Sequence, residues 1–369
     1  MDKIAIIGAN TAITMLINKA KLLGYETHVF AWACGDPGEK AADYFYPISI
    51  DRKEEIAEKC RNIGVVGVCS ITSDFAAPTV SYVARELGLP CNPEITGELA
   101  RNKYKMRCAF KEAGLYTPPF ILIGDDYTER DIASINYPAI VKPTDRWSSK
   151  GVTRVNNKVE LNAALKYAIE ESFNKQAIVE EFMDGPEYSA ECICYNKDRR
   201  ILAFTQKETT GAPHYIESGH FQPAKLTSDE RNKATSIILK ALEALHINNS
   251  AAHAEFKILP DGEIGIIEIG ARMGGDCIGT DLTPVSTGMD YIRMVIDIAC
   301  GNSPDFSVTT NPVSVKIKFI MNRNDLIELK RIQRDAPELI VRIAEIDENF
   351  DREVVDSSTR HGYYILKTK

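Results

Sequence analysis

The sequence lacks three features that would assign it to a broad class at once. It has no apolar run of membrane-spanning length, no signal-peptide pattern in its opening residues and no cluster of basic side chains. Its 52 Asp and Glu outnumber its 44 Lys and Arg, which gives a formal net charge of −8. An acidic chain of this kind is not expected to have nucleic acid or a membrane as its main partner. The sequence therefore predicts a cytoplasmic protein.

Cysteine is present, but not in a pattern that binds metal or forms a redox pair. Nine cysteines, an odd number with no C-x-x-C spacing, are typical of a reduced compartment. Cys192 and Cys194 alternate along one face of an expected strand, and we interpret them as packing residues. The composition, 44% hydrophobic and 26% charged, is typical of a globular protein, and 369 residues are enough for two or three domains.

The N-terminal part lacks most of the glycines of a dinucleotide-binding fingerprint. Strands expected at 3–7, 26–32, 46–50 and 65–69 alternate with helices at 12–23 and 52–62, which predicts parallel βαβ units. Only Gly8 of the expected glycines is present, and the second strand ends in Phe30-Ala31-Trp32 where an acid would bind the ribose. We therefore expect a Rossmann-like domain without a dinucleotide, and a dehydrogenase is the disfavoured alternative.

The middle of the chain alternates between helices and short strands. Asp74 is expected to cap a helix over 75–87, and a helix over 97–113 leads into a second domain. Strand 138–142, a loop with two serines and strand 152–155 resemble a flap that covers phosphate, because backbone N–H groups and hydroxyls would contact phosphate oxygens. The next expected elements are a helix at 158–172 and strands at 176–183, 187–195 and 201–206.

Residues 207–223 have no periodicity and collect Thr, Gly, His and Pro, which is the composition of a functional loop. His214 and His220 in this loop are either ordinary polar residues or substrate ligands. Thr227 and Glu230 then form a capping box for a helix over 228–246. After a further helix at 289–300, the tail has three strand-like runs, at 313–320, 339–346 and 361–367, which predict a small α/β cap.

A hairpin within residues 252–275 brings two acids together. Two apolar runs flank Asp261-Gly262, a dipeptide suited to a two-residue turn. That turn would pair Leu259 with Ile264 and, further out, Glu255 with Glu268. Like charges directly opposite each other destabilise a sheet unless something neutralises them. A divalent cation would do so, and hard oxygen ligands suit Mg²⁺; the alternative is that one Glu is solvated and the register slips.

The run Gly270–Gly275 follows the second strand of the hairpin and places Arg272 just beyond the two acids. An Arg side chain can hold a carboxylate or a phosphate by two parallel hydrogen bonds. A metal and a guanidinium at one strand end together indicate phosphoryl chemistry.

Four of these stretches occur in the order found in the ATP-grasp superfamily, which includes biotin carboxylase and D-alanine–D-alanine ligase. They read RNKYKMR, PAIVKPTDRWSSKGV, VEEFMDGPEYSAE and AEFKILPDGEIGIIEIGARMGGD, and the resemblance covers nearly the whole chain. It implies an α/β protein (an α+β ATP-grasp fold) with a Rossmann-like domain at 1–96 and a two-lobed ATP-grasp module at 97–305. It also implies a mobile lid at about 118–180 and a C-terminal α/β cap at 306–369.

By position, the resemblance also assigns roles to residues. It assigns Lys103 and Lys142 to the phosphates of ATP, Ser148, Ser149 and Gly151 to the phosphate loop, Glu180, Glu181 and Phe182 to the hinge at adenine, and Glu187 to the ribose. It assigns Glu255 and Glu268 to Mg²⁺ (or Mn²⁺), which agrees with the hairpin, and Arg272 to the reacting carboxylate. Gly270 departs from the pattern, since many relatives carry an Asn metal ligand there, and the number of metal ions is therefore left open.

The activity implied by the resemblance is an ATP-dependent carboxylate–amine ligase that works through an acyl phosphate. The loop with His214 and His220 and the pair Gly274-Gly275 are most similar to the L-amino-acid (dipeptide) ligases, which implies an amino-acid substrate and makes a homodimer possible. One alternative is an enzyme that activates bicarbonate or formate, as in carbamoyl-phosphate or purine synthesis. Another is a nucleotide-binding subunit without turnover.

Overall fold

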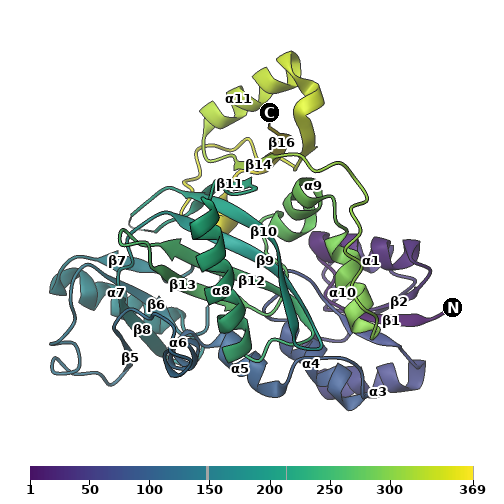
Figure 1. Ribbon diagram of the computed structural model, residues 1–369, viewed down its shortest axis with the longest axis horizontal. Coiled ribbons are helices and arrows are strands. Elements are labelled where there is room, and N and C mark those ends of the chain that lie inside the picture. The colour runs from purple at the N-terminus through teal and green to yellow at the C-terminus, as the bar shows by residue number, and fades with distance from the viewer. Residues whose placement is uncertain (147–148, 213, 369) are drawn as a thin grey trace.

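The computed structural model describes residues 1–146, 149–212 and 214–368, and its strands form three sheets (Figure 1). The first sheet is parallel, with the order β3-β2-β1-β4. Its strands are β1 (Lys3–Ile7), β2 (Glu26–Phe30), β3 (Tyr44–Tyr46) and β4 (Gly67–Cys69), and its helices are α1 (Thr11–Leu22), α2 (Pro37–Ala41), α3 (Lys53–Ile63) and α4 (Ala77–Glu86). The predicted βαβ units are therefore present, although the third strand ends where the sequence predicts that it starts.

The second sheet is antiparallel, with the order β5-β8-β6-β7, and we call it the lid sheet. Its strands are β5 (Phe120–Gly124), β6 (Ala139–Pro143), β7 (Thr153–Val155) and β8 (Gln176–Glu181), and α7 (Lys158–Glu171) packs on it. Two helices precede it, α5 (Glu94–Arg101) and α6 (Lys103–Glu112). The sequence predicts one helix here, but Asn102 is extended and its side chain accepts a hydrogen bond from the Lys105 N–H, which starts a new helix.

The third sheet has eight strands in the order β13-β12-β9-β10-β11-β14-β16-β15, and we call it the central sheet. Its strands are β9 (Glu187–Tyr195), β10 (Asp198–Thr209), β11 (Glu217–Gln222), β12 (Ser250–Ile258), β13 (Ile264–Gly270), β14 (Val315–Phe319), β15 (Ile340–Ile343) and β16 (Tyr363–Lys367). The remaining helices are α8 (Ser228–Ala244), η1 (Ile278–Leu282), α9 (Thr283–Thr287), α10 (Tyr291–Ala299), α11 (Arg323–Asp335), η2 (Pro337–Leu339) and η3 (Ser357–Thr359). The predicted capping box at Thr227 and Glu230 starts α8.

One expectation about the central sheet is wrong, and another is refined by the strand order. Most of the stretch 207–223 is strand, because β10 continues to Thr209 and β11 begins at Glu217. The three tail strands form as predicted, but β14 pairs with β11, so they extend the central sheet and build no sheet of their own.

Alternation along β12 decides which residues reach each face of the central sheet. Ala252, Ala254 and Phe256 are buried in the core under α8, together with Cys192 and Cys194 of β9, which confirms these cysteines as packing residues. His253 and Glu255 consequently lie on the opposite face, the face where Ala251 packs against α10.

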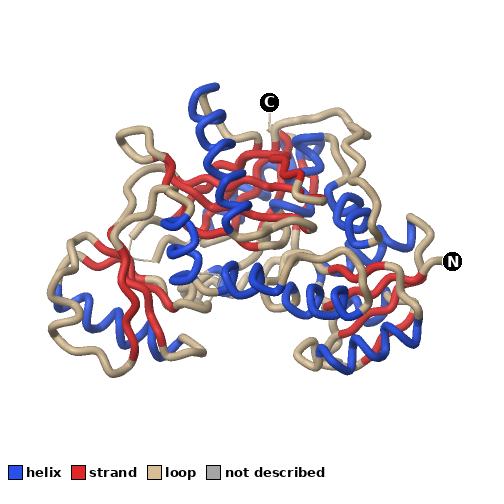
Figure 2. Tube along the Cα trace, turned by 60° about the horizontal axis from the view of Figure 1, so that its bottom comes forward, coloured by secondary structure: helices blue, strands red, loops and turns tan. Residues whose placement is uncertain are grey.

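One hydrophobic core joins the first sheet to the central sheet. It contains side chains of β1, α1, β9, β12 and α10, and Figure 2 shows the central sheet between the first sheet and the lid sheet. The first sheet is thereby packed against the face of the central sheet that carries Ala251. The lid sheet has a hydrophobic core of its own.

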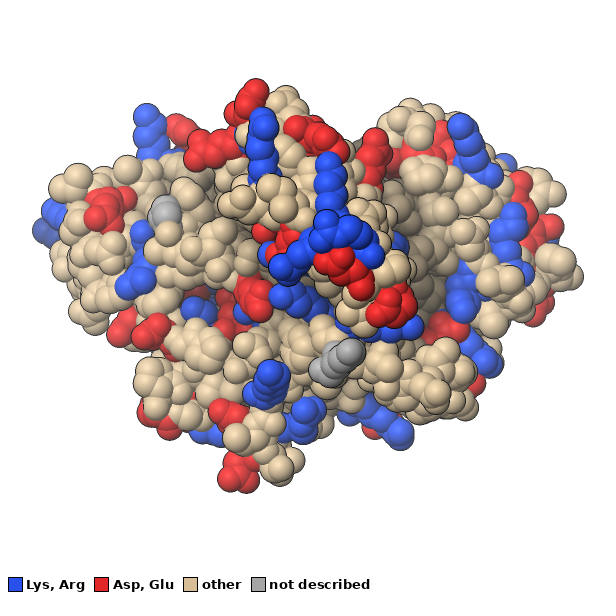
Figure 3. All heavy atoms as spheres, turned by 90° about the horizontal axis from the view of Figure 1, so that it is seen from above, with Lys and Arg blue, Asp and Glu red and all other residues tan. Residues whose placement is uncertain are grey.

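On the face drawn in Figure 3, Lys and Arg side chains are interspersed with Asp and Glu side chains. Within the described part of the chain, no helix is both long and apolar enough to cross a membrane.

The hairpin of β12 and β13 pairs Glu255 with Glu268, as the sequence predicts, but it reaches this register by another route. The turn is a three-residue loop, since Leu259 N–H donates to the Glu263 carbonyl at 2.9 Å, and this shifts the pairing by one residue. A bulge at Glu255 and Phe256 leaves Ile267 without a partner and shifts the pairing back. The two deviations cancel exactly where the acids stand opposite each other.

The turn makes a prediction about stability. Gly262 has φ of +77° with no atom within 4 Å of an added Cβ, so Gly262→Ala should destabilise the fold by about 1 kcal/mol through backbone strain alone. Gly97 is equally open but lies inside α5 with an ordinary φ, so Gly97→Ala should stabilise by about 0.5–1 kcal/mol. Urea denaturation of both variants measures the difference, and effects of the same sign would contradict the assigned turn.

Candidate functional site

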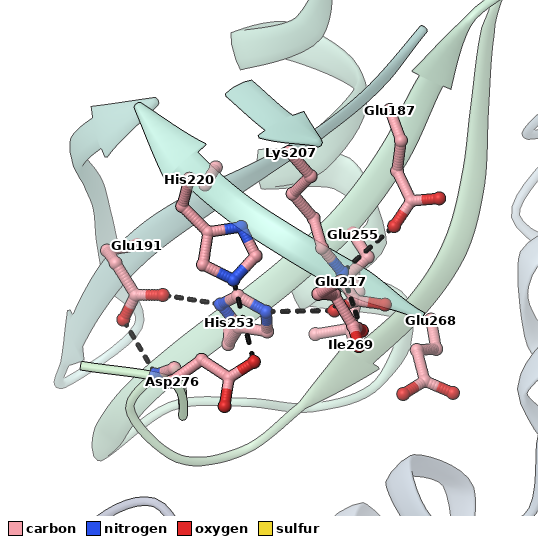
Figure 4. Close-up of polar contacts among 12 residues, drawn as sticks. Glu187, Glu191, Lys207, Glu217, His220, His253, Glu255, Glu268, Ile269 and Asp276 are labelled. Carbon is pink, nitrogen blue, oxygen red and sulfur yellow. Dashed lines mark hydrogen bonds and ion pairs between the residues drawn. The ribbon is translucent and has the colours of Figure 1, made fainter. Parts of the chain in front are cut away.

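Glu255 and Glu268 stand opposite each other on neighbouring strands and line the same two cavities (Figure 4). Each carboxylate has a lysine partner from a distant part of the chain. Lys207 Nζ on β10 lies 2.6 Å from Glu255 Oε1, and Lys103 Nζ on α6 lies 2.9 Å from Glu268 Oε2. In this structure two ammonium groups therefore neutralise the pair of acids that the hairpin predicts.

Lys207 is the centre of a buried charge cluster that the sequence does not reveal. Its Nζ also lies 2.9 Å from Glu187 and 3.7 Å from Glu217. Burial alone would lower the pKa of Lys207, but the carboxylates of Glu187, Glu255 and Glu217 hold it well above its ordinary value. In the sequence, Lys207 is the first residue after the strand expected at 201–206, and nothing there identifies its three partners.

His253 supports Glu255 from the neighbouring position on the same face of β12. Its Nε2 lies 3.2 Å from Glu255 Oε1, and its Nδ1 contacts the carboxylate of Glu191 on β9. Burial alone would lower the pKa of His253, but Glu191 and Glu255 raise it to about 9, so that the ring is protonated at neutral pH and both ring N–H groups donate.

The first cavity, of about 880 Å³, lies between the lid sheet and the central sheet. Its apolar part includes Phe182 and Tyr215, whose ring centroids lie 6.0 Å apart, and Lys257 Nζ lies 4.6 Å from the centroid of Phe182. Most of the residues assigned to ATP by position line it, namely Lys103, Lys142, Ser149, Glu180, Glu181, Phe182 and Glu187, and so do the two residues assigned to the metal, Glu255 and Glu268. His214 lines this cavity as well, while Ser148 lies outside the described residues.

Glu180 has a role that the sequence does not suggest, because its side chain is buried in an ion-paired triad. Its carboxylate contacts the Lys142 ammonium and accepts a hydrogen bond from Arg107 Nε at 2.9 Å. Burial would raise the pKa of Glu180, but Arg107 and Lys142 lower it to about 2, and burial lowers the pKa of Lys142. Arg107 Nη2 also donates to the carbonyl of Ile267, the bulged residue, at 2.9 Å. The triad thus ties Lys142 of the lid sheet to the hairpin.

The second cavity, of about 1070 Å³, adjoins the first at the acids. The two cavities share Ser149, Lys207, Glu217, Glu255 and Glu268. The second also takes residues from the first sheet's loops and from the tail, including Asn10, Thr72, Ser73, Asp74, Phe75 and Ser357. Arg272, His220 and Gly275, three of the residues assigned to substrate, line it.

Arg272 is held by Asp74, which corrects the role expected for that acid. Arg272 Nη2 and Nε lie 2.7 and 3.0 Å from the two Asp74 oxygens, and Nη1 donates to the Met273 carbonyl at 3.1 Å. Asp74 therefore does not cap α4, whose N-cap position is Ala76. A Cβ at residue 270 would meet Asp74 Oδ1 at 2.9 Å and the Arg272 guanidinium at 3.2 Å. Gly270, the departure from the family pattern, makes room for this pair.

Three other residues with an assigned role, His220, Gly274 and Gly151, make close contacts with other parts of the protein. His220 is buried, with Nε2 3.6 Å from Asp276, which also forms a two-pronged pair with Arg360 at 2.6 and 2.9 Å. Gly274 donates its N–H to Glu191 at 2.9 Å. Gly151 does not line either cavity, and a Cβ there would collide with the Pro143 ring.

The described residues contain no group of three or more His, Cys, Asp and Glu side chains arranged to hold a metal ion. Within the described part of the chain, the oxygen donors that the family pattern assigns to a cation are the two opposed carboxylates of Glu255 and Glu268. No described residue donates a hydrogen bond to Glu255 Oε2 or to Glu268 Oε1, so one oxygen of each acid is uncommitted. Two carboxylate oxygens on adjacent strands are the donor type that Mg²⁺ prefers, with water completing its coordination.

Comparison with known proteins identifies a domain family within the chain and two groups of related enzymes. Residues 135–281 match the ATP-grasp domain family. The chain is 30% identical over 298 residues to alanine–anticapsin ligase of Bacillus subtilis, covering 70% of this chain and 61% of that enzyme. It is 27% identical over 179 residues to D-alanine–D-alanine ligase of a Thermoanaerobacter species, covering 42% of this chain and 47% of that enzyme.

Among solved structures, an L-amino acid ligase from Bacillus licheniformis superposes with a TM-score of 0.83 at 24% identity, covering 100% of this chain and 93% of that one. N5-carboxyaminoimidazole synthetase from Staphylococcus aureus, in complex with ADP, superposes with a TM-score of 0.79 at 18% identity, covering 100% and 93%. The fold similarity thus extends over the whole chain, whereas the chain spans about 61% of the length of the first curated relatives.

The buried triad generates a prediction about stability. Arg107→Met leaves a carboxylate buried beside one remaining cation and removes the hydrogen bond to Ile267, so it should cost about 3–5 kcal/mol of unfolding free energy. Arg85→Met breaks an exposed pair with Glu94 and should cost less than about 1 kcal/mol. Urea denaturation compares them, and equal costs would contradict the structural role of the triad.

Proposed function

This chain is a member of the ATP-grasp superfamily, and on that premise we propose that it is an ATP-dependent carboxylate–amine ligase with an amino-acid substrate. In the proposed reaction, a substrate carboxylate attacks the γ-phosphate of ATP, the bond to ADP breaks, and an acyl phosphate forms. The amine of a second substrate then attacks the acyl carbon, phosphate leaves, and the amine gives up a proton. The products are an amide, ADP and phosphate.

The observation that carries this proposal is the junction of the two cavities at the opposed acids. Glu255, Glu268 and Lys207 line both cavities, so a group transferred between a nucleotide in one and a carboxylate in the other would pass beside them. A ligase of this type needs such a junction, because the γ-phosphate and the attacking oxygen must meet in line.

The first cavity has the groups that a nucleotide requires. Lys103 and Lys142 supply positive charge for phosphate oxygens, and the stacked Phe182 and Tyr215 supply an apolar surface for a base. Glu187, which lines the same cavity, would accept hydrogen bonds from ribose hydroxyls once Lys207 releases it. These roles are proposals that follow the family pattern residue by residue.

Mg²⁺ fits the donor set of Glu255 and Glu268, and when bound it would supply positive charge against the triphosphate. The chain itself would keep the two carboxylates opposed and would supply Lys103 and Lys207 to the phosphate oxygens. In this structure Lys103 and Lys207 hold these acids, so a bound metal would compete with the lysines for them. Binding of metal and nucleotide together would satisfy both sets of charges.

The second cavity suits an organic acid and an amine. Arg272, oriented by Asp74, retains N–H groups that can hold a carboxylate, and His220 and Gly275 lie on the same walls. Two curated relatives have names that include alanine as a substrate, which favours amino acids.

Exclusion of water is the remaining requirement, because water would hydrolyse an acyl phosphate. We propose that residues 118–180 of the ATP-grasp module at 97–305 close as a lid over the first cavity. The parts at 1–96 and 306–369 contribute walls to the second cavity, through residues such as Asn10 and Ser357.

A screen for ADP and phosphate release tests this function. L-amino acids, singly and in pairs, are incubated with MgATP, and products are identified by mass spectrometry; we expect ADP release that depends on an amino acid, with a dipeptide-type amide as product. Glu268→Gln, which keeps the shape of the side chain, should lower the rate at least about 100-fold. Release that requires bicarbonate or formate and no amino acid would favour the alternative activity, and nucleotide binding without any release would favour a non-catalytic subunit.

The competition between lysine and metal generates a further prediction. Lys103→Met frees Glu268, so Mn²⁺ should bind about three- to tenfold more tightly without nucleotide, while ATP binds more weakly. Lys105→Met is the matched control, because Lys105 lies on the same helix but pairs with the exposed Glu98. Electron paramagnetic resonance of free Mn²⁺ measures the affinity, and an unchanged or weaker affinity in Lys103→Met would contradict the competition.

A further inference from the structure

A row of three buried or half-buried ionisable side chains crosses β9 and β12 and ends at Glu255, one of the opposed acids (Figure 4). Glu191 on β9 and His253 on β12 are direct cross-strand partners, and Glu255 follows His253 on the same face of β12. His253 bridges the two acids, with Nδ1 on a Glu191 oxygen and Nε2 3.2 Å from Glu255 Oε1. The row thus runs from the interior of the sheet to a proposed metal ligand.

The inner end of the row is fixed from a second direction. The Gly274 N–H, in the loop that follows β13, donates to the other oxygen of Glu191 at 2.9 Å. A Cβ at residue 274 would stand 2.7 Å from His253 Nδ1, so only glycine lets the backbone come this close. Both oxygens of Glu191 are therefore occupied, and neither Glu191 nor His253 can rotate without losing a hydrogen bond.

Stability does not account for this arrangement. Glu191 is 0% exposed and His253 is 5% exposed, and burying such groups costs desolvation that packed apolar side chains would avoid. A fully hydrogen-bonded polar row does, however, restrict its members to one arrangement. That property is useful where the last member must present a chosen atom.

This fixed row gives the two carboxylate oxygens of Glu255 different surroundings. Oε1 accepts from both Lys207, at 2.6 Å, and His253, whereas no described residue donates to Oε2. If Lys207 leaves to bind phosphate, His253 still holds Oε1 and the carboxylate keeps its orientation. Glu268 has no comparable support from a buried side chain, since its partner Lys103 is itself proposed to move to phosphate.

We propose that Glu191 and His253 are positioning residues that hold Oε1 of Glu255 and thereby present Oε2 to the divalent cation. This inference rests on the proposed function, because it assumes a metal at the opposed acids. Glu191 lies outside both cavities, whereas His253 also lines the second cavity, and in this assignment both act on the metal through Glu255. Their effect passes through the orientation of one carboxylate.

The test measures metal binding directly. Mn²⁺ affinity is determined by electron paramagnetic resonance in the presence of a non-hydrolysable ATP analogue, for the wild type and for His253→Gln, Glu191→Gln and Glu255→Gln. We expect the first two variants to weaken Mn²⁺ binding by about 10–100-fold, as loss of a group that orients a metal ligand does. His246→Gln, an exposed histidine outside both cavities, is the matched control and should bind Mn²⁺ as the wild type does.

Two further readouts separate positioning from a purely structural role. The affinity for the ATP analogue in EDTA should not change, and the metal concentration for half-maximal ADP release should rise while the rate at saturating metal is largely regained. An equal loss of analogue affinity in EDTA would overturn the inference in favour of general disruption. Glu191→Gln keeps an acceptor for the Gly274 N–H, so it carries the test if His253→Gln does not fold.

The outcomes also distinguish this inference from the function on which it rests. If wild-type protein with the analogue binds no Mn²⁺, the proposed metal site fails and the inference fails with it. If Glu255→Gln weakens binding but His253→Gln and Glu191→Gln bind Mn²⁺ as the wild type does, the positioning role alone is overturned.

Discussion

Glu255 and Glu268 face each other across two hydrogen-bonded strands, and this repulsion must be neutralised for the central sheet to keep its register. In this structure the neutralising charges come from Lys103 on α6, the helix before the lid sheet, and from Lys207 on β10, two places from β12 in the central sheet. The surrounding parts of the molecule are therefore connected to the hairpin by charge. Arg107 adds a third connection, because it joins the Glu180–Lys142 pair to the carbonyl of the bulged Ile267.

The sequence predicts the hairpin and its acid pair, but part of that success comes from compensating errors. Asp261-Gly262 correctly marks the turn, yet the loop has three residues and the bulge at Glu255 and Phe256 restores the register. A dipeptide is enough to predict a turn. A bulge depends on contacts with distant residues, and here Arg107 donates a hydrogen bond to the carbonyl of the bulged Ile267. The parallel βαβ order of the first sheet and the capping box of α8 are likewise local signals, and both are confirmed.

What the sequence does not reveal depends on contacts between distant segments. Asp74 looks like a helix cap by its position, but it pairs with Arg272, 198 residues away, and Gly270 is small because that pair needs the space. Lys207 and His253 carry no motif, and their importance follows from carboxylates on β9, β11 and β12. The tail strands are identifiable as strands, but only the free edge of β11 decides that they extend the central sheet.

The central claim is that the opposed acids exchange their lysines for a divalent cation when a nucleotide binds. A crystal structure with Mg²⁺ and a non-hydrolysable ATP analogue tests it most directly. The account predicts Mg²⁺ at about 2.0–2.1 Å from an oxygen of each of Glu255 and Glu268, with the ammonium groups of Lys103 and Lys207 moved to phosphate oxygens. A cation bound elsewhere, or lysines still paired with both acids beside the bound analogue, would contradict it.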